Sequence, residues 1–464
     1  MRVIKFGGTS VQNADRITTV LHIAATASRA PGGAVLVSSA LSGTTSQLLQ
    51  IADLAKNQQR EQAAQLVEDI RRRHLGEAAQ LLRADSTLLQ QLNQQIQEIV
   101  SRIASLLEGI LLLRECSGRT RDALVSCGEF LATAIIAAAA VELKMESEWL
   151  DARKLICTDN TFGSAQVDFA QSDTQIQTII QPNQGHLYIT QGFIGSTAGT
   201  VTTTLGRGGS DYSAAIIASA LGAEALEIWT DVDGIMTTDP RIVPQASRIP
   251  AMSYSEAAEL AYFGAKVVHP STMQPVVTAG IPIYVRNTHN QHSPGTVISN
   301  EKRALGLRAI AEKKEITVIT VQSSRMLHAY GFMQNLFSVF ARNRIAVDLV
   351  ATSEVSVSVT IDPAAVVGDL DTALHELKEL GETVVETGMS IICLVGHDLW
   401  KDASFVARVF SSLKTIPVRL ISLGSSDVNL SLVVPEEYRT ESVRRIHQEF
   451  FPPAEPNTRE ALHV

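Results

Sequence analysis

Apolar runs alternate with amphipathic stretches along the first part of the chain. Residues 2–6 and 34–38 are short apolar runs, and the segment 14–27 between them places apolar residues at helical spacing. The unbroken run at 34–38 fits a strand buried on both faces, as in a parallel sheet. Each run leads into a loop of small residues, at 7–10 and 39–45. This alternation predicts an α/β fold with a mostly parallel sheet, in which ligands bind at the carboxyl ends of the strands, where both loops lie.

The alternation continues to about residue 297. Residues 47–113 are rich in Gln, Glu, Leu and Ala and predict a helical insertion, in which we interpret Arg71, Arg72 and Arg73 as a solvated face. The remaining pattern predicts helices over 121–141 and 255–263, and strands over 147–151, 187–193 and from 225 into an acidic turn ending at 235. It also predicts 281–285 as the last strand of this domain, with a boundary near Ser293-Pro294-Gly295.

The tail, residues 298–464, contains an internal repeat. Residues 345–350 match 416–421, which lie 71 positions further along. Each copy predicts the order strand, helix, two strands, helix of a ferredoxin-like βαββαβ unit, and the second copy lacks its final strand. We expect Leu305 to Ala311 to supply that strand. The first unit, about 314–389, would then be inserted into the second, formed by about 300–312 plus 390–455.

Composition narrows the class of protein. A chain of 464 residues favours two or three domains, and a net charge of −9 argues against a nucleic-acid partner. No apolar run reaches transmembrane length, and the N-terminal residues do not resemble a signal peptide, so no membrane partner is expected. The four cysteines form no CxxC pair and are expected to be free thiols in a reducing compartment, which favours a cytoplasmic location.

Candidate chemistry centres on Leu205–Asp211, which carries three glycines, Arg207 and Asp211 at the start of a predicted helix. Glycines let the backbone approach a ligand, a helix N-terminus binds anions, and arginine binds carboxylates or phosphates. Alone, the stretch fits equally a glycine-rich turn with a solvated arginine and a capping aspartate. Together with Lys5 and the glycines after the first strand, it suggests phosphoryl transfer, which depends on positioning and charge neutralisation. The P-loop and GxGxxG patterns are absent from the sequence.

Five ordered motifs resemble those of aspartokinases, within the amino-acid kinase fold. They are Lys5–Ser10, Leu205–Tyr212, Trp229–Gly234, Thr238–Arg241 and Tyr262–Pro270. The duplicated tail resembles the paired ACT regulatory domains of the same family, so the resemblance covers nearly the whole chain. It implies a sheet sandwich of the amino-acid kinase type at 1–297, followed by two ACT units. The implied activity is ATP-dependent phosphorylation of the β-carboxylate of L-aspartate to 4-phospho-L-aspartate, the first step towards lysine, threonine and methionine.

The resemblance also implies residue roles. Lys5 would stabilise the transferred phosphoryl group, assisted by Asp211; Arg207 would bind the α-carboxylate of aspartate and Glu129 its ammonium group. The full substrate set is Ser39, Thr45, Glu129, Arg207, Gly208, Gly209 and Ser210. The full ATP set is Lys5, Gly7, Gly8, Thr230, Asp231, Met236, Arg241 and Lys266, where Met236 stands in a position that often holds tyrosine in the family. Mg²⁺ would arrive with ATP, without protein side-chain ligands. Taken singly, Lys5 fits an edge-strand charge and Glu129 a solvated helix residue.

Two tail motifs, 326–332 and 347–356, resemble the lysine-sensitive class of aspartokinases, in which the first ACT unit binds lysine at a dimer interface. The resemblance implies a homodimer formed through the ACT units, with Asp348 and Glu354 facing the ammonium groups of lysine. The implied allosteric set is Met326, Ala329, Gly331, Phe332, Met333, Val347, Asp348, Ser353 and Glu354.

Two alternatives remain open at this point. One is another amino-acid kinase, acting on glutamate, acetylglutamate or a carbamate. The other is an inactive amino-acid-sensing protein that keeps the ACT pair. Within the aspartokinase interpretation, threonine is the competing effector.

Overall fold

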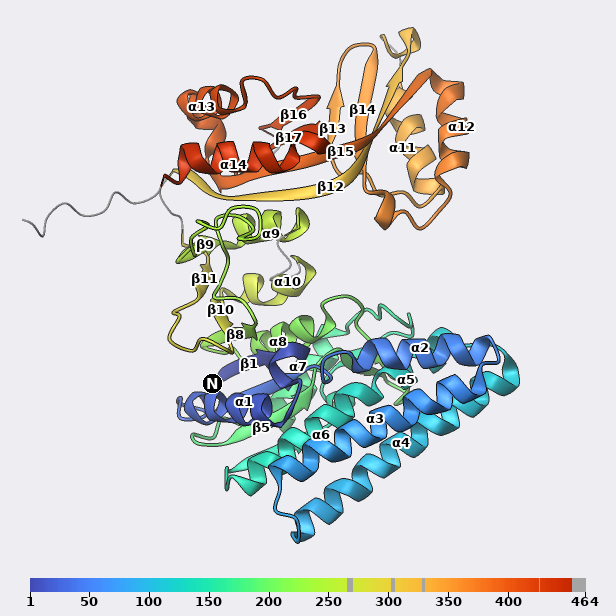
Figure 1. The fold of residues 1–464 in the computed structure, drawn as a ribbon, viewed down its shortest axis with the longest axis vertical. Coiled ribbons are helices and arrows are strands. Elements are labelled where there is room, and N and C mark those ends of the chain that lie inside the picture. Colours follow the sequence, from blue (N-terminus) through green and yellow to red (C-terminus); the bar gives the residue numbers. More distant parts are fainter. Residues whose placement is uncertain (265–269, 302–304, 328–329, 425, 453–464) are drawn as a thin grey trace, which may run out of the picture. The chain divides into compact units, whose positions relative to one another are not determined.

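The computed structural model describes residues 1–264, 270–301, 305–327, 330–424 and 426–452 (Figure 1). These residues form two compact units. The first contains Met1–Ile235, Pro250–Tyr254 and 270–301, and the second contains Met236–Ile249, 255–264 and the described tail from 305 onwards.

The main sheet of the first unit is largely parallel, as predicted. Its strand order is β3-β5-β2-β1-β8-β10-β11-β9, and the strands from β3 to β10 run parallel to their neighbours. The bounds are β1 Arg2–Phe6, β2 Ala34–Ser38, β3 Ser147–Leu150, β5 Leu187–Gln191, β8 Ala225–Thr230, β9 Ala251–Ser253, β10 Ile283–Asn287 and β11 Thr296–Ser299. In the register, Lys5 lies between Val37 and Ile228, so the carboxyl ends of β1, β2 and β8 meet at one edge.

The expectation that 281–285 is the last strand of this domain is wrong. After the turn at 293–295 the chain returns as β11, antiparallel to β10. Its four residues, Thr-Val-Ile-Ser, contain only two apolar positions, which is too short a pattern to separate a strand from a loop.

A second, small sheet precedes the Leu205–Asp211 stretch. It consists of β4 Cys157–Thr158, β6 Ile194–Thr197 and β7 Thr202–Thr204, in the order β4-β6-β7. All three threonines of β7 are buried, and Thr203 shares a hydrogen bond with Thr158 at 2.7 Å. The Leu205–Asp211 stretch therefore begins directly after a buried, hydrogen-bonded strand. Its last three residues form the start of α8, Gly209–Ala220.

The helical insertion packs on the side of the first unit that carries α1 and α6 (Figure 1). Its helices are α2 Thr44–Lys56, α3 Arg60–Leu81 and α4 Thr87–Leu113; they share one apolar core with α1 Ala14–Ala27 and α6 Cys127–Glu142. The predicted helix over 121–141 is interrupted at Ser126, which separates α5, Gly118–Val125, from α6. The stretch Gly118–Glu142 is long and apolar enough to cross a membrane, but 89% of its most apolar window is buried, as in the core helix of a globular domain. The remaining helices of the first unit are α7 Phe169–Ile179 and α10 Pro270–Ala279, whereas α9 Tyr254–Tyr262 belongs to the second unit from Ser255 onwards.

The tail forms one sheet with the order β13-β14-β12-β15-β17-β16. Its strands are β12 Gly306–Gln322, β13 Val350–Thr352, β14 Ser356–Ile361, β15 Glu382–His397, β16 Leu420–Leu423 and β17 Asn429–Pro435. Helices α11 Phe332–Arg342 and α12 Leu370–Leu380 enclose one apolar core, and α13 Ala403–Leu413 and α14 Arg439–Phe450 enclose another. The two ferredoxin-like units of the predicted fold are therefore present.

The long strands β12 and β15 pass through both units of the tail. The first part of β12, up to Lys313, pairs with β15 from Ile391 onwards, and its last part pairs with residues 382–386. The register shifts between Lys313 and Ile316, where Glu315 has a φ of 58°. Residues near 306–313 thus complete the sheet of the second copy, which is the pairing that an inserted first unit requires.

Candidate active site

The reacting centre that the sequence predicts is assembled where β1 ends. Lys5 Nζ lies 2.6 Å from Asp211 Oδ1, and their side chains are only 11% and 16% exposed. Lys5 comes from β1 and Asp211 from the first turn of α8, so the pair joins two elements that lie about 200 residues apart in sequence. The edge-strand interpretation of Lys5 is wrong, because β1 lies between β2 and β8.

The glycines after β1 leave room beside this ion pair. A Cβ on Gly7 would lie 3.8 Å from Lys5 Nζ, and one on Gly8 would lie 3.0 Å from the Ala40 carbonyl oxygen. The loops after β1 and β2 therefore pack backbone against backbone, and Ser39 N also donates to Phe6 O at 3.2 Å. A short 3₁₀ helix, η1 Gly8–Val11, follows and leads towards α1. Free backbone N–H groups at such a helix start suit an anion.

The start of α8 brings the substrate candidates to the same edge. Gly206 and Gly208 have φ values of 76° and 70°, a conformation that L side chains rarely adopt, so the turn into α8 depends on them. Ser210 then lies against Ser39, with 3.0 Å between the two Oγ atoms. Arg207 is exposed and makes no ion pair or hydrogen bond within the described residues. Its guanidinium group is thus available to a carboxylate.

Glu129 is buried rather than solvated. It lies on α6, is 3% exposed, and its Oε1 accepts a hydrogen bond from Ala40 N at 3.3 Å. Burial raises the pKa of this carboxyl to about 8, against the lowering effect of the Ala40 hydrogen bond. A cation placed beside Glu129 would favour the ionised form. Thr45 is half-buried as the second residue of α2, and that helix is capped by Gly43, not by the threonine side chain.

Asp122 was not anticipated from the sequence. It is 1% exposed on α5; its Oδ2 accepts from Gly163 N at 3.0 Å and Thr204 N at 2.9 Å, and its Oδ1 accepts from Thr204 Oγ1 at 2.9 Å. Burial raises its pKa, and these hydrogen bonds oppose the rise. The carboxylate therefore fixes the end of β7, directly before Leu205 and Arg207. The only signal in the sequence was an acidic residue inside an apolar predicted helix.

The predicted nucleotide residues are divided between the two units. Thr230 ends β8, and its Oγ1 donates to Asp231 Oδ1 at 3.1 Å. Thr288 N donates to the Thr230 carbonyl at 2.8 Å, and Thr288 Oγ1 lies 2.7 Å from Ser10 Oγ, so the end of β8 is tied to the loop after β1. Met236 and Arg241 belong to the second unit, where Arg241 pairs with Asp239 at 2.6 Å. Lys266 lies outside the described residues.

The predicted allosteric residues all belong to the second unit. Gly331 precedes α11 with a φ of 82°, Phe332 is buried, and Met333 is exposed. Met326 and Val347 pack on the apolar core beside α11, Glu354 is exposed, and Ser353 Oγ lies 2.7 Å from Ser356 Oγ. Ala329 lies outside the described residues.

Asp348 already has internal partners. Its Oδ2 lies 2.7 Å from Lys313 Nζ, and its Oδ1 accepts a hydrogen bond from the Tyr262 hydroxyl at 2.6 Å. Lys313 Nζ is also 3.4 Å from Asp362 Oδ2. Burial, and then the hydrogen bond to Asp348, raise the pKa of Tyr262. The acid expected to face an effector ammonium is thus occupied by a lysine of the same chain.

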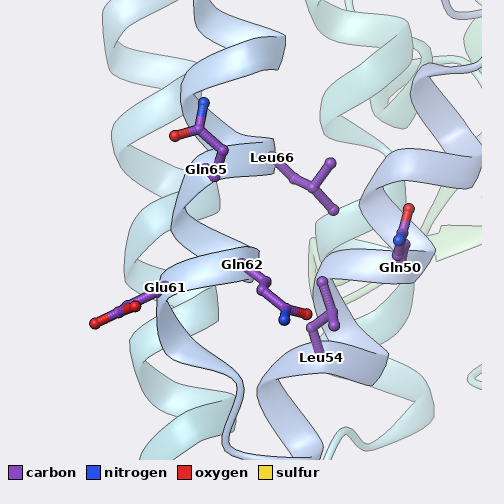
Figure 2. Close-up of a pocket in the computed structure, with 6 residues that line it drawn as sticks. All are labelled: Gln50, Leu54, Glu61, Gln62, Gln65 and Leu66. Carbon is purple, nitrogen blue, oxygen red and sulfur yellow. The ribbon is translucent and has the colours of Figure 1, made fainter.

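A groove elsewhere in the first unit contains none of these residues. It has a volume of about 370 Å³ and lies between α2 and α3, lined by Gln50, Leu54, Glu61, Gln62, Gln65 and Leu66 (Figure 2). Its polar groups are mainly amides, and nothing in it resembles the charged edge at β1. Among the described residues, no group of three or more His, Cys, Asp or Glu side chains is placed to hold a metal ion.

Known proteins share this organisation. The model of the amino acid kinase family matches residues 1–287, and the model of the ACT domain matches 319–379 and 392–450. The lysine-sensitive aspartokinase 3 of Escherichia coli (strain K12) is 37% identical over 457 residues, which cover 97% of this chain and 99% of that protein. Aspartokinase 2, chloroplastic, of Arabidopsis thaliana is 34% identical over 467 residues, 97% of this chain and 84% of that protein.

Solved structures agree with the sequence comparison. The crystal structure of E. coli aspartokinase III in complex with aspartate and ADP, in the R-state, has a TM-score of 0.82 at 36% identity and covers 97% of this chain and 100% of that one. The T-state structure with lysine and aspartate has a TM-score of 0.78 at 35% identity, with 97% and 99% coverage. The chain belongs to the amino acid kinase family, and within that family to the aspartokinases, the kinases that act on a carboxyl group of aspartate.

Proposed function

We propose that this aspartokinase forms 4-phospho-L-aspartate at the edge of the sheet where Lys5 and Asp211 meet. The ion pair between them is the observation that carries the proposal. It places a cation beside Gly7, where the lack of a side chain leaves space, and at the start of α8, where an anion is favoured. A phosphoryl group in transfer needs this kind of positive environment.

In the proposed reaction, an oxygen of the aspartate β-carboxylate attacks the γ-phosphorus of ATP, and ADP leaves on the opposite side. The carboxylate is ionised at neutral pH, so no general base is required. Lys5 neutralises charge on the transferred group, while Asp211 holds its ammonium group in place. A charge held in place in this way stabilises the transition state more strongly than it would in water, because the ion pair is largely buried.

Substrate binding follows from the charges around that centre. Arg207 would bind the α-carboxylate, and Glu129 the ammonium group. Ser39, Ser210 and Thr45 would supply hydroxyl groups, and the backbone at Gly208 and Gly209 would allow close approach. The buried position of Glu129 supports its role, and so does the exposed guanidinium of Arg207, which has no partner among the residues that the structure describes.

The nucleotide would contact Lys5, Gly7, Gly8, Thr230 and Asp231, with Met236, Arg241 and Lys266 as further predicted contacts. The ADP in the E. coli structure supports a nucleotide at this fold. Mg²⁺ on the ATP phosphates would neutralise part of their charge. The carboxylate at the centre, Asp211, is already paired with Lys5, so we propose that the metal is carried by the nucleotide.

A hydroxamate assay coupled to ATP tests the activity. Hydroxylamine traps an acyl phosphate, so aspartate should give product while glutamate, acetylglutamate and a carbamate should not. Product from one of these three instead of aspartate would favour another amino-acid kinase. No product with any of them would favour an inactive amino-acid sensor.

We also propose lysine as the feedback inhibitor, bound by the first ACT unit near Asp348. Support comes from the E. coli relative, which is named lysine-sensitive, and from its complex with lysine. Inhibition by threonine without inhibition by lysine would overturn this assignment.

A homodimer through the ACT units and a cytoplasmic location complete the proposal. Strands β13 and β16 end the tail sheet, and Val350 and Ile421 on them are 40% and 47% exposed, which suits a second copy. The four cysteines are free, which suits a reducing compartment. Light scattering after size exclusion measures the assembly, and a monomeric mass would reject the dimer.

A further inference from the structure

Arg73 lies on α3 of the helical insertion, and its side chain turns towards the loops after β1 and β2. Its Nη1 donates to the Ser42 carbonyl at 2.7 Å, and its Nη2 donates to the Gln12 carbonyl at 3.0 Å. The neighbouring arginines behave differently, because Arg71 and Arg72 pair with acids on α3 itself. The solvated-face interpretation is therefore wrong for Arg73.

The two carbonyls belong to the loops that build the proposed site. Gln12 directly follows η1, which starts at the phosphate-binding glycines. Ser42 lies between Ala40, whose N–H donates to Glu129, and Thr45. One guanidinium group thus joins the phosphate side of the site to its aspartate side.

Glu77 adds a second contact one turn further along the same face of α3. Its Oε2 accepts from Ala14 N, the first residue of α1, at 2.7 Å. Residues four apart lie on one face of a helix. From that face, Arg73 binds the carbonyl of Gln12, two residues before α1, and Glu77 binds the first N–H of α1. Since α1 begins directly after the loop of β1, both contacts restrain that loop.

Ordinary helix packing does not account for this pair. The core contacts of α3 are made by other residues, such as Ile70, His74 and Ala78, which are buried. The donors of Arg73 reach loop carbonyls instead of another helix. Moreover, the two loops approach so closely that a Cβ on Gly8 would lie 3.0 Å from the Ala40 carbonyl oxygen, so we expect a change in their separation to be felt at the site.

We propose that Arg73 is a positioning residue that sets the distance between the phosphate-binding loop and the aspartate-binding loop, which gives the helical insertion a role in catalysis. The proposal rests on the proposed function of those loops. Misplacement of reacting groups by about 1 Å costs on the order of 100-fold in rate. The guanidinium fork offers each carbonyl its own nitrogen in a fixed plane, whereas the single nitrogen of a lysine ammonium would have to approach both carbonyls and would hold their separation less firmly.

The kinetic test compares Arg73→Gln with Arg72→Gln, its exposed neighbour on the same helix. We expect Arg73→Gln to lower kcat by about 10- to 100-fold at a temperature where the variant remains folded, because the reacting groups are no longer held together. Arg72→Gln should keep the wild-type kcat and KM. Arg73→Lys, which retains the charge and one hydrogen bond, should fall between them. Equal kcat values for Arg73→Gln and Arg72→Gln would overturn the proposal.

Hydrogen–deuterium exchange gives a second measurement that needs no activity. Arg73→Gln should speed exchange in 7–12 and 39–43 by about 10- to 100-fold, as expected for the loss of charge-assisted hydrogen bonds, while Arg72→Gln should not. Unchanged exchange in both loops would count against Arg73 even if the activity fell. If the wild-type chain fails to phosphorylate aspartate, the proposed function fails, and the exchange comparison still decides whether Arg73 restrains the loops. Should Arg73→Gln fail to fold, Arg73→Lys against Arg72→Lys makes the same comparison.

Discussion

Lys313 Nζ lies 2.7 Å from Asp348 Oδ2, so the acid predicted to bind an effector ammonium is paired with an ammonium group of the chain itself. The side chain of Asp348 is only 4% exposed, and that of Lys313 is 18% exposed. An incoming lysine must therefore replace Lys313 or share the carboxylate with it. If Asp348 binds the effector as proposed, we expect the internal pair to act as a competitor that raises the lysine concentration needed for inhibition.

Removing the competitor should sensitise the enzyme. Lys313→Met keeps the apolar stem in β12 and removes the ammonium group beside Asp348, which retains its hydrogen bond from Tyr262. Half-inhibition should therefore occur at a lysine concentration lower by about 10-fold, the effect of one charge-assisted hydrogen bond. Asp348→Asn should weaken lysine inhibition in the same assay, and Lys314→Met on the same strand serves as the matched control. A variant at Lys313 that needs more lysine than wild type would contradict the competitor role.

Lys5→Met should remove most of the chemical step. The variant keeps a stem of similar size in β1 but loses the charge beside the transferred phosphoryl group. By analogy with loss of one preorganised donor, kcat should fall by about 10²- to 10³-fold. Hydroxamate formation measures this loss, and Lys56→Met, an exposed lysine at the end of α2, is the control for charge alone. Wild-type turnover in Lys5→Met would remove Lys5 from the reacting centre.

Asp122 allows a test that separates geometry from charge. Asp122→Ala leaves the N–H groups of Gly163 and Thr204 without their buried acceptor, which loosens the residues before Arg207. KM for aspartate should rise by about 10-fold while KM for ATP changes little, since one lost hydrogen bond to the α-carboxylate is worth about that factor. Asp122→Asn keeps an oxygen for both N–H groups and an amide donor for Thr204 Oγ1, so it should restore aspartate binding. Equal KM values in the alanine and asparagine variants would show that Asp122 does not act through this geometry.

Glu129 should make aspartate binding depend on pH. With a pKa raised to about 8 by burial, the free enzyme holds a proton on this carboxyl at neutral pH. Because the substrate ammonium binds the ionised form, KM for aspartate should fall as pH rises from about 6 to 8, with proton release on binding. Calorimetry in buffers of different ionisation enthalpy measures that proton. In Glu129→Gln, KM for aspartate should be higher than in the wild type and should no longer change with pH. If the variant kept the wild-type dependence of KM on pH, the assignment of Glu129 would be contradicted.

The same carboxyl should affect stability in the opposite direction. Between its ordinary pKa of 4.5 and about 8, Glu129 is protonated in the folded enzyme and ionised in the unfolded chain. The folded state then binds more protons, so the free energy of unfolding falls as pH rises through this window. Glu129→Gln should lose less stability than wild type between pH 5 and pH 8, by a difference on the order of a few kcal/mol. Denaturant titrations at both pH values measure it, and parallel losses in the two proteins would count against a buried proton.

Much of this molecule could be predicted from sequence because its signals are local. The apolar periodicity of 14–27 predicts the bounds of α1, and the run at 34–38 predicts β2, since burial on one face or both leaves a regular pattern. The ordered glycine, lysine and aspartate motifs likewise indicate the class of enzyme. Arg73 and Asp122 could not be found in this way. Three adjacent arginines look alike in a sequence, and only the approach of α3 to two distant loops decides which one binds their carbonyls.

One consequence follows from the register of β12 and β15. Lys313 and Ile391 are paired across the antiparallel strands β12 and β15. If the residues between them, which form the first ACT unit, were deleted, the two chain ends left in the second unit would lie side by side. A two-residue turn such as Asn-Gly would close that gap as a hairpin. On the proposed arrangement, the first unit, which carries the predicted effector residues, could then be replaced as one continuous segment, whereas its host is formed by two separate segments of the chain. We expect an engineer who wishes to redirect feedback control to find the two cutting points at Lys313 and Ile391.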